Sequence, residues 1–284
     1  MEGKFSETTS QQGVGHEDHG LGENEQFTKV YSLPPDFRVE VLDIRGPVEV
    51  ECHDAAEAEV TVVRRAASRA DLAYHRVIIE HTATALVVGG MIETDSDSRS
   101  VTVLHHVRLR LPARIALFAQ RISGPLNIDK VAGPVNINSI SGSVTLAEAD
   151  GETILHSISG SCRIGTTSGR LEVKSLSGSL EVGRLTGGLN VSNVSGEVSA
   201  RIALLDENGL QVSSISGPVQ LFFAEEVNAD LNIQHVSGRI DLELPDVTYT
   251  GGMAPWSVRA RVGDGSLPVS ISYVSGPVRI IRLV

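Results

Sequence analysis

The sequence predicts an all-β protein built as a parallel β-solenoid, with two strands in each coil of about 18 residues. Three observations predict this fold. Nine successive glycines recur every nine residues from Gly124 to Gly196, aliphatic and polar residues alternate after each of them, and alternate glycines are preceded by different residue types. A short internal repeat of this kind is typical of a solenoid, in which each coil packs on its neighbours.

Each nine-residue unit combines one short strand with one corner. In the unit that begins at Gly178, the inward residues are Leu180, Val182 and Leu185, and the alternation with polar residues indicates a half-buried strand. Glycine lacks a Cβ and therefore tolerates a tight corner. Because aromatic residues make up only 4% of the chain, we expect aliphatic side chains to fill the interior.

Serine marks every second corner, so the true repeat has 18 residues. A nucleophile needs one serine beside a base, whereas these serines are equivalent, and we expect a structural ladder whose hydroxyls bond backbone groups or one another. The ladder consists of Ser123, Gly124, Ser141, Gly142, Ser159, Gly160, Ser177, Gly178, Ser195, Gly196, Ser216, Gly217, Ser237, Gly238, Ser275 and Gly276.

Stacked coils should place residue i beside residue i+18, at a spacing of about 4.8 Å. Charges support this register, since it puts Glu152 beside Arg170 and Arg163 beside Glu181. Exposed ion pairs contribute ~0–1 kcal/mol each, so the aliphatic rows must hold the coils together. Spacings of 21, 21 and 38 residues between the last serine corners predict two enlarged coils and one coil with an insertion at about residues 239–275.

Three segments divide the chain. Residues 1–26 are acidic and lack apolar periodicity, so we expect a disordered tail. Residues 27–120 contain several alternating segments, and Ser68 is placed to cap a short helix that extends to about Arg76. We expect this β-rich segment to cap one end of the solenoid, which occupies residues 121–284.

Composition and charge exclude several classes of protein. The 284 residues carry a formal charge of −11, and no segment concentrates the positive charge that nucleic-acid binding requires. No run approaches the roughly 18 apolar residues of a membrane span, and the polar start lacks a signal-peptide core, so we expect a cytoplasmic protein. Cys52 and Cys162 lie far apart in the sequence and predict buried thiols.

Three motifs carry a family resemblance. They are the segment FRVEVLDIRGPVEVE, which contains an early copy of the repeat at Ile44–Val48, the LRLP segment at Leu109–Pro112, and the tandem SISGSV-like units. Over roughly residues 30–284, the sequence resembles the bacterial "putative adhesin" family of β-strand-repeat proteins, a domain family of unknown function. The resemblance implies a β-solenoid with an adhesin-like role, and it supplies no named catalytic residue.

Candidate ligands for metals and cofactors do not form a recognisable site in the sequence. The segment His16–His19 lies in the acidic tail and lacks the spacing of a helical zinc motif. His105 and His106 are neighbours in a predicted strand, so their rings should point to opposite faces. The repeat also lacks the recurrent aspartate of calcium-binding β-rolls. We predict no catalytic residue, no metal site and no cofactor.

We expect a non-enzymatic scaffold that makes protein–protein contacts or self-associates, through its faces or its C-terminal edge. The terminal segment Gly276–Val284 ends on an apolar strand without a polar cap, which would leave an edge for pairing. A regulatory sensing module and a carbohydrate-binding or carbohydrate-active β-helix protein are the alternatives. In a carbohydrate-active protein, Trp256, Asp246 and Asp264 of the insertion would line the pocket; otherwise this loop covers the end of the core.

Overall fold

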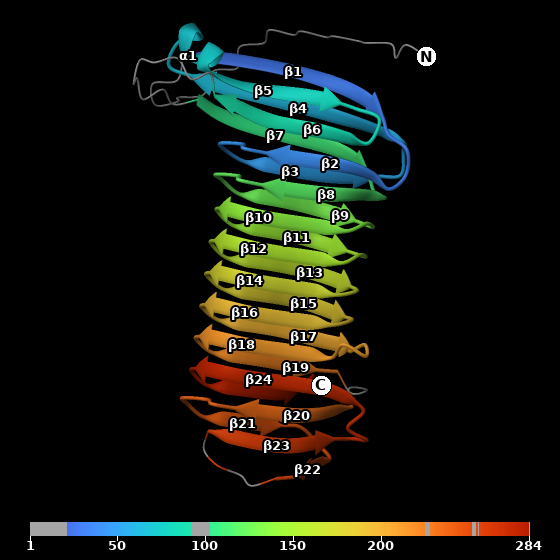
Figure 1. The fold of residues 1–284 in the computed structure, drawn as a ribbon, viewed down its shortest axis with the longest axis vertical. Coiled ribbons are helices and arrows are strands. Elements are labelled where there is room, and N and C mark those ends of the chain that lie inside the picture. The colour runs from blue at the N-terminus through green and yellow to red at the C-terminus, as the bar shows by residue number, and fades with distance from the viewer. Residues whose placement is uncertain (1–21, 93–102, 225–227, 252–253, 255, 284) are drawn as a thin grey trace.

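Two long sheets face each other across an aliphatic core and form one rod, which stands upright in Figure 1. The computed structural model describes residues 22–92, 103–224, 228–251, 254 and 256–283. One sheet has 12 strands and the other has 13, and most neighbouring strands run parallel. The parallel β-solenoid predicted from the sequence is confirmed.

Six central coils stack in the order of the chain, and each contributes one strand to each sheet. Val135 pairs with Thr153, and Thr153 pairs with Leu171, so the predicted register of 18 residues is confirmed. The strands are β8 (Ile115–Gln120), β9 (Leu126–Val131), β10 (Val135–Ser141), β11 (Val144–Ala149), β12 (Thr153–Ser159), β13 (Cys162–Ser168), β14 (Leu171–Ser177), β15 (Leu180–Thr186), β16 (Leu189–Ser195), β17 (Val198–Leu204), β18 (Leu210–Ser216) and β19 (Val219–Phe223).

Side chains across the coils follow this register with one exception. Arg163 Nε lies 2.9 Å from Glu181 Oε2, as predicted. Arg170, for which we expected Glu152 as partner, instead lies 3.3 Å from the carboxylate of Glu172. The reason is that residue 170 sits in a corner, where the side chain reaches the adjoining strand β14 more easily than the coil below.

The interior consists of aliphatic rows, as the alternating pattern predicts. Leu180, Val182 and Leu185 are all buried in one continuous core. Burial also raises the pKa of the Cys162 thiol to about 12, which keeps it protonated. Neither Cys162 nor the half-buried Cys52 forms a disulfide.

The serine–glycine corners require glycine for two reasons. Gly160 has φ of +156°, and a Cβ atom there would lie 2.4 Å from the carbonyl oxygen of Gly142 in the next coil. Three residues before each corner glycine, a second row adopts left-handed φ values of 53–57°. This row, which the sequence analysis did not identify, comprises Asp43, Arg121, Ser139, Ser157, Ser175, Asn193, Ser214, Tyr273 and His235.

The last coils do not stack in the order of the chain, contrary to our expectation. β24 (Leu267–Ser275) lies between β18 and β20 (Ala229–Gln234), and β25 (Val278–Arg282) lies between β19 and β21 (Ile240–Glu243). The C-terminal coil is therefore inserted between the two coils that precede it. Its side chains at Ile271 and Ile280 are fully buried, whereas Ile240 and Leu242 of the displaced coil are only partly buried. Burying the more apolar coil on both sides explains this order.

The predicted C-terminal edge for self-association is consequently wrong, because β25 is paired on both sides. The solenoid ends instead at β21 and at an antiparallel hairpin formed by β22 (Val247–Tyr249) and β23 (Ser257–Val262). The hairpin pairs with β20 and buries Val258 and Val262 against the core. Part of the predicted insertion thus covers the end of the core.

The N-terminal end is built in a similar way. The coil formed by β2 and β3 lies between β6 and β7 on one side and β8 and β9 on the other, and antiparallel strands continue outward to β1 and β5. The elements are β1 (Glu23–Ser32), β2 (Phe37–Leu42), β3 (Val48–His53), β4 (Glu57–Ala66), α1 (Arg69–Tyr74), β5 (His75–His81), β6 (Ala85–Ile92) and β7 (Val103–Pro112).

Local predictions for the N-terminal segment can be compared with this arrangement. Ser68 Oγ accepts a hydrogen bond from the backbone N–H of Asp71 at 3.2 Å, and it caps α1 as predicted. Arg45 pairs with Ser123, so Ile44–Val48 is a copy of the repeat. β1 begins at Glu23, which places four residues of the expected tail in a strand, while His16–His19 lies outside the described residues. Within the described segments, no helix has the length and apolar character of a membrane span.

Candidate functional site

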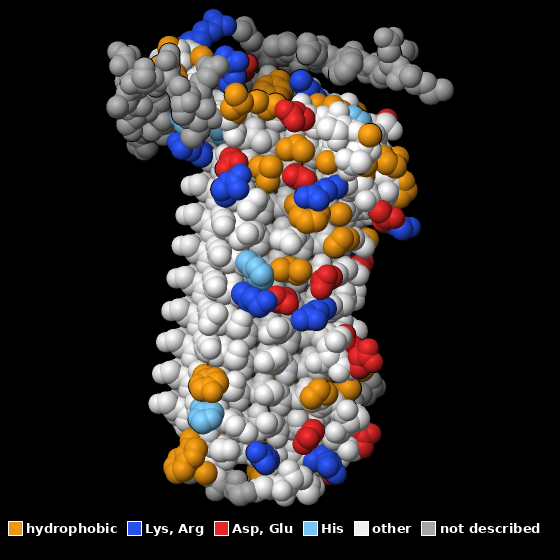
Figure 2. Space-filling view, in the orientation of Figure 1, with side chains coloured by type: hydrophobic (Ala, Val, Ile, Leu, Met, Phe, Trp, Pro, Cys, Tyr) orange, Lys and Arg blue, Asp and Glu red, His pale blue; other side chains and the backbone are white. Residues whose placement is uncertain are grey.

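The serine ladder forms an exposed row along one edge of the solenoid. Its members are Cα partners from coil to coil, and all eight serines are exposed. The row lies at the left of Figure 1, where the arrowheads of β10 to β18 point, and this edge carries few charged or hydrophobic side chains in Figure 2. Backbone hydrogen bonds hold the coils in register here, for example from Gly142 N to Ser159 O at 3.1 Å.

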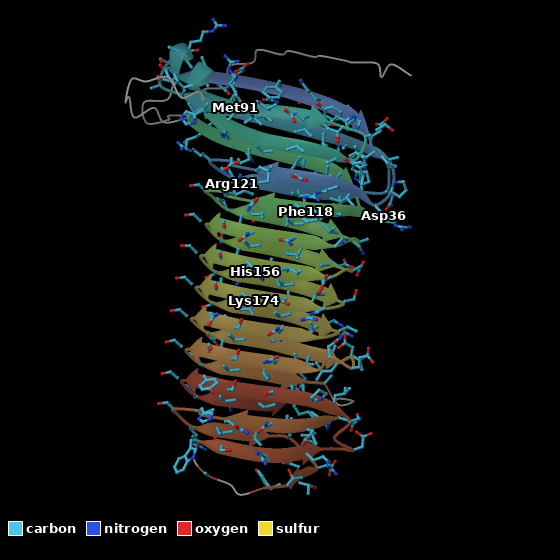
Figure 3. The ribbon with its side chains drawn as sticks, in the orientation of Figure 1. Asp36, Met91, Phe118, Arg121, His156 and Lys174 are labelled. Atoms are coloured by element: carbon cyan, nitrogen blue, oxygen red, sulfur yellow. The ribbon has the colours of Figure 1, made fainter. Side chains whose placement is uncertain are left out.

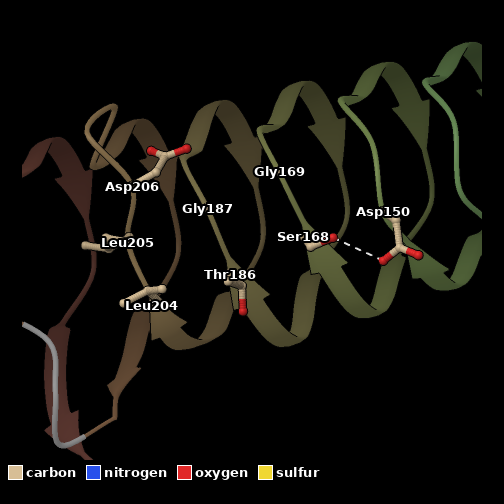
Figure 4. A pocket seen from close by; sticks show the side chains of 8 residues that line it. All are labelled: Asp150, Ser168, Gly169, Thr186, Gly187, Leu204, Leu205 and Asp206. Atoms are coloured by element: carbon tan, nitrogen blue, oxygen red, sulfur yellow. Dashed lines mark hydrogen bonds between the residues drawn. The ribbon is translucent and has the colours of Figure 1, made fainter.

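A shallow groove of about 430 Å³ follows the opposite row of corners (Figure 4). Two carboxylates mark its ends. Ser168 Oγ donates to Asp150 Oδ1 at 3.1 Å, and Asp206 Oδ1 accepts from Asn208 N at 2.9 Å. Its lining consists of Asp150, Ser168, Gly169, Thr186, Gly187, Leu204, Leu205 and Asp206.

One wall of this groove comes from the first enlarged coil. Three additional residues in this coil form a loop at 205–209, which carries Asp206. The loop packs over Gly188, where a Cβ atom would lie 3.0 Å from Asn208 Cβ and 3.1 Å from Asp206 Oδ1. Leu204 lies beside the loop and is 49% exposed. The spacing of the corners predicted the enlarged coil, but it did not indicate that the loop forms a groove.

A cluster of basic groups surrounds one carboxylate on the outer face of the 13-stranded sheet. Glu172 contacts Arg170, Lys174 and His156, and the last two are labelled in Figure 3. The hydrogen bond from Lys174 is the largest of the favourable influences that lower the pKa of Glu172. The cluster joins β12 to β14 across the sheet, and its mutual neutralisation indicates a structural role.

The three residues proposed to line a carbohydrate-active pocket do not come together. Trp256 and Asp264 flank opposite ends of β23, whereas Asp246 adjoins β22 at the end nearer Asp264. Asp264 Oδ1 accepts from Ser266 N at 3.0 Å and so belongs to a turn. Because β23 spans roughly 20 Å, this set cannot act on one bond of a substrate.

Exposed aromatic rings instead gather at the end of the serine-ladder edge. Tyr273 and His235 stack in parallel, with centroids 5.1 Å apart and planes inclined by 4°. Trp256 O accepts a hydrogen bond from Val236 N at 3.3 Å, which brings Trp256 beside His235. The exposed fractions of Tyr273 and Trp256 are 65% and 61%. The sequence analysis missed this group, although Tyr273 and His235 both stand three residues before a corner glycine.

Buried histidine His105 lies in β7 of the N-terminal cap, next to His75, Arg64 and Arg45. Arg64 Nη1 donates to the backbone oxygens of Leu72 and His75, at 2.8 and 2.9 Å. Burial is the main cause that lowers the pKa of His105 to about 4. Across the described residues, no group of three or more His, Cys, Asp and Glu is arranged to hold a metal ion.

We expect His105 to make the fold sensitive to acid. The unfolded chain binds a proton at His105 near pH 6.5, whereas the folded chain binds it only near pH 4. Stability present above pH 6.5 is therefore lost as the pH falls toward 4, by up to about 3 kcal/mol. His105→Leu should remove this part of the pH dependence, as measured by urea unfolding at pH 7 and pH 5. His53→Asn is the control, and an unchanged slope in His105→Leu would contradict the assignment.

Residues 92–280 match a family described as Toastrack DUF4097, which confirms the resemblance indicated by the sequence motifs. Solved structures similar to the chain include a "putative adhesin" from Parabacteroides distasonis, with 12% identity, coverage of 93% of this chain and 100% of that chain, and a TM-score of 0.38. Another "putative adhesin", from Bacteroides fragilis, has 8% identity, coverage of 90% and 97%, and a TM-score of 0.36. A comparison with curated proteins gave no match.

Proposed function

This chain belongs to the Toastrack DUF4097 family, and we propose that it is a non-enzymatic β-solenoid scaffold that mediates contacts with a protein partner. The rod presents long, regular surfaces whose outward side chains are held in register by the backbone. Such a surface supports binding without movement of the core, because the position of each side chain is fixed by the coils on both sides.

The groove of Figure 4 is the observation that carries this proposal. Leu204 offers an exposed apolar side chain, and carboxylates at Asp150 and Asp206 flank it. Lys130 Nζ lies 3.7 Å from Asp150 Oδ2 and offsets part of that charge, whereas Asp206 bonds only a backbone N–H in the described contacts. The partner that complements this groove is an extended protein segment with an apolar side chain beside a lysine or arginine.

The chemistry of the groove favours binding over catalysis. Ser168 donates to Asp150, but this carboxylate also faces Lys130 and lies in an open groove, so water has free access to it. The Cys162 thiol is buried with a pKa raised to about 12. Both features oppose the activated nucleophile in a water-excluded site that covalent catalysis uses.

Selection of phage-displayed random peptides on the immobilised full-length protein tests this function. We expect the enriched peptides to combine basic and apolar residues. Their affinity should fall at least tenfold in the double variant Leu204→Ser/Asp206→Asn, because the apolar contact and the charge are both lost.

Glu181→Gln is the matched control for this selection, since it removes an exposed carboxylate that pairs with Arg163 away from the groove. Equal affinity for the groove variant and the control would contradict the proposal. Failure to enrich any basic peptide would contradict it as well.

A further inference from the structure

An uncharged band crosses the outer face of the 13-stranded sheet over four neighbouring strands, β16, β18, β24 and β20. The register aligns the outward side chains of these strands in two columns. They carry amides and hydroxyls without a charge: Asn190, Ser192, Gln211, Ser213, Ser270, Ser272, Asn232 and Gln234. In Figure 2, this band is the white area in the lower part of the visible face.

Charged side chains delimit the band on both sides. Glu172 and Lys174 lie on β14, next to β16, while Arg259 and Arg261 lie on β23, next to β20. The absence of charge is notable in a chain with 21% charged residues and a formal charge of −11. A ligand that lies along this band would meet hydrogen-bonding groups and no net charge.

The aromatic group borders the same band. Tyr273 follows Ser272 in β24, and His235 follows Gln234 at the end of β20. Trp256 is bonded through its backbone beside His235. Hydrophobic and histidine side chains accordingly appear at the lower left margin in Figure 2, over the arrowheads of β24 and β20. Amide and hydroxyl groups thus lie next to exposed rings.

We propose that this band binds a neutral polysaccharide, with Tyr273, His235 and Trp256 stacking against sugar rings. Sugar hydroxyls both donate and accept hydrogen bonds, as the amides and hydroxyls of the band do. The weakly polar faces of sugar rings fit aromatic side chains, which combine a large apolar area with a polar edge. An acidic polysaccharide or a nucleic acid would require the positive charge that the band lacks.

The regular spacing of the band suits a repeating polymer. Each strand offers the same types of group about 4.8 Å from the last, so the successive units of a polymer meet similar partners. Among these eight side chains, the described hydrogen bonds include one pair, from Gln234 Nε2 to Asn232 Oδ1 at 2.7 Å. The proposal is independent of the groove of Figure 4, which lies along the opposite row of corners.

Affinity electrophoresis of the full-length protein tests this inference, with gels that contain xyloglucan, galactomannan, mixed-linkage β-glucan or soluble starch. Alginate and polygalacturonate serve as charged comparators. We expect at least one neutral polysaccharide to retard the protein, with little dependence on salt. Tyr273→Ala/Trp256→Ala should weaken this retardation at least tenfold, and Gln211→Ala should weaken it in the same direction.

Tyr249→Ala is the matched control, because Tyr249 is an exposed aromatic residue on β22, outside the band. It should retain binding, and circular dichroism verifies that each variant is folded. The proposal is overturned if none of the four neutral polymers retards the protein, if the acidic polymers bind equally well, or if the double variant binds like the control. Concentration-dependent dimers that disappear in Tyr273→Ala, without retardation, would assign the surface to a second copy of the chain and also overturn it.

Discussion

Gly160→Ala should destabilise the solenoid by about 3 kcal/mol or more, although it adds a single methyl group. At φ of +156°, a residue with a Cβ is strained by about 1–3 kcal/mol. The new methyl group would also approach the carbonyl oxygen of Gly142 to 2.4 Å. This oxygen belongs to the backbone of the adjacent coil, so relief of the contact requires the two coils to separate.

Gly89→Ala provides the control for this prediction. Gly89 lies in β6, has no heavy atom within 4 Å of an added Cβ, and lies outside the left-handed region. Its replacement should change stability by less than about 1 kcal/mol. The midpoint of urea unfolding, followed by circular dichroism, compares the two variants. Similar midpoints would show that the serine–glycine corners do not require glycine.

The same geometry explains how much of the fold could be predicted. A glycine every nine residues identifies the corners because each corner glycine faces the backbone of the preceding one, as Gly142 faces Gly124. The 18-residue register then follows, and with it the row of aliphatic side chains. Periodicity carries this information because every central coil has the same two neighbours.

Periodicity could not reveal the order of the last coils. The corners at Ser216, Ser237 and Ser275 have the same local pattern, and any one of them can pack on any other. Their order depends on the burial of Ile271 and Ile280 and on the length of chain between β21 and β24, which are properties of the whole stack. The groove beside Leu204 also depends on how a loop packs on a neighbouring coil.

Both ends of the rod limit further stacking of strands. At the C-terminal end, β21 has four residues, and its sequence IDLE includes Asp241 and Glu243. Short and charged edge strands resist pairing with another chain. Ion pairs tie the inserted coil to this edge, since Arg279 Nη2 lies 2.6 Å from Glu243 Oε1. These features explain why the apolar C-terminal strand lies inside the stack.

Disulfide trapping between engineered cysteines tests the inserted C-terminal coil most directly. Ser272 is the Cα partner of Ser213 on one side and of Gln234 on the other. Neighbouring parallel strands lie about 4.8 Å apart, within the range that a disulfide spans, whereas strands two places apart lie about 10 Å from each other. Stacking in chain order would instead make Ser213 and Gln234 neighbours.

The experiment uses a background of Cys52→Ser and Cys162→Ala, with mild oxidation and detection by peptide mapping. We predict that Ser213→Cys/Ser272→Cys and Gln234→Cys/Ser272→Cys cross-link almost completely. Ser213→Cys/Gln234→Cys should remain reduced. Efficient cross-linking of Ser213→Cys/Gln234→Cys, together with a reduced Ser213→Cys/Ser272→Cys pair, would contradict the insertion of the C-terminal coil.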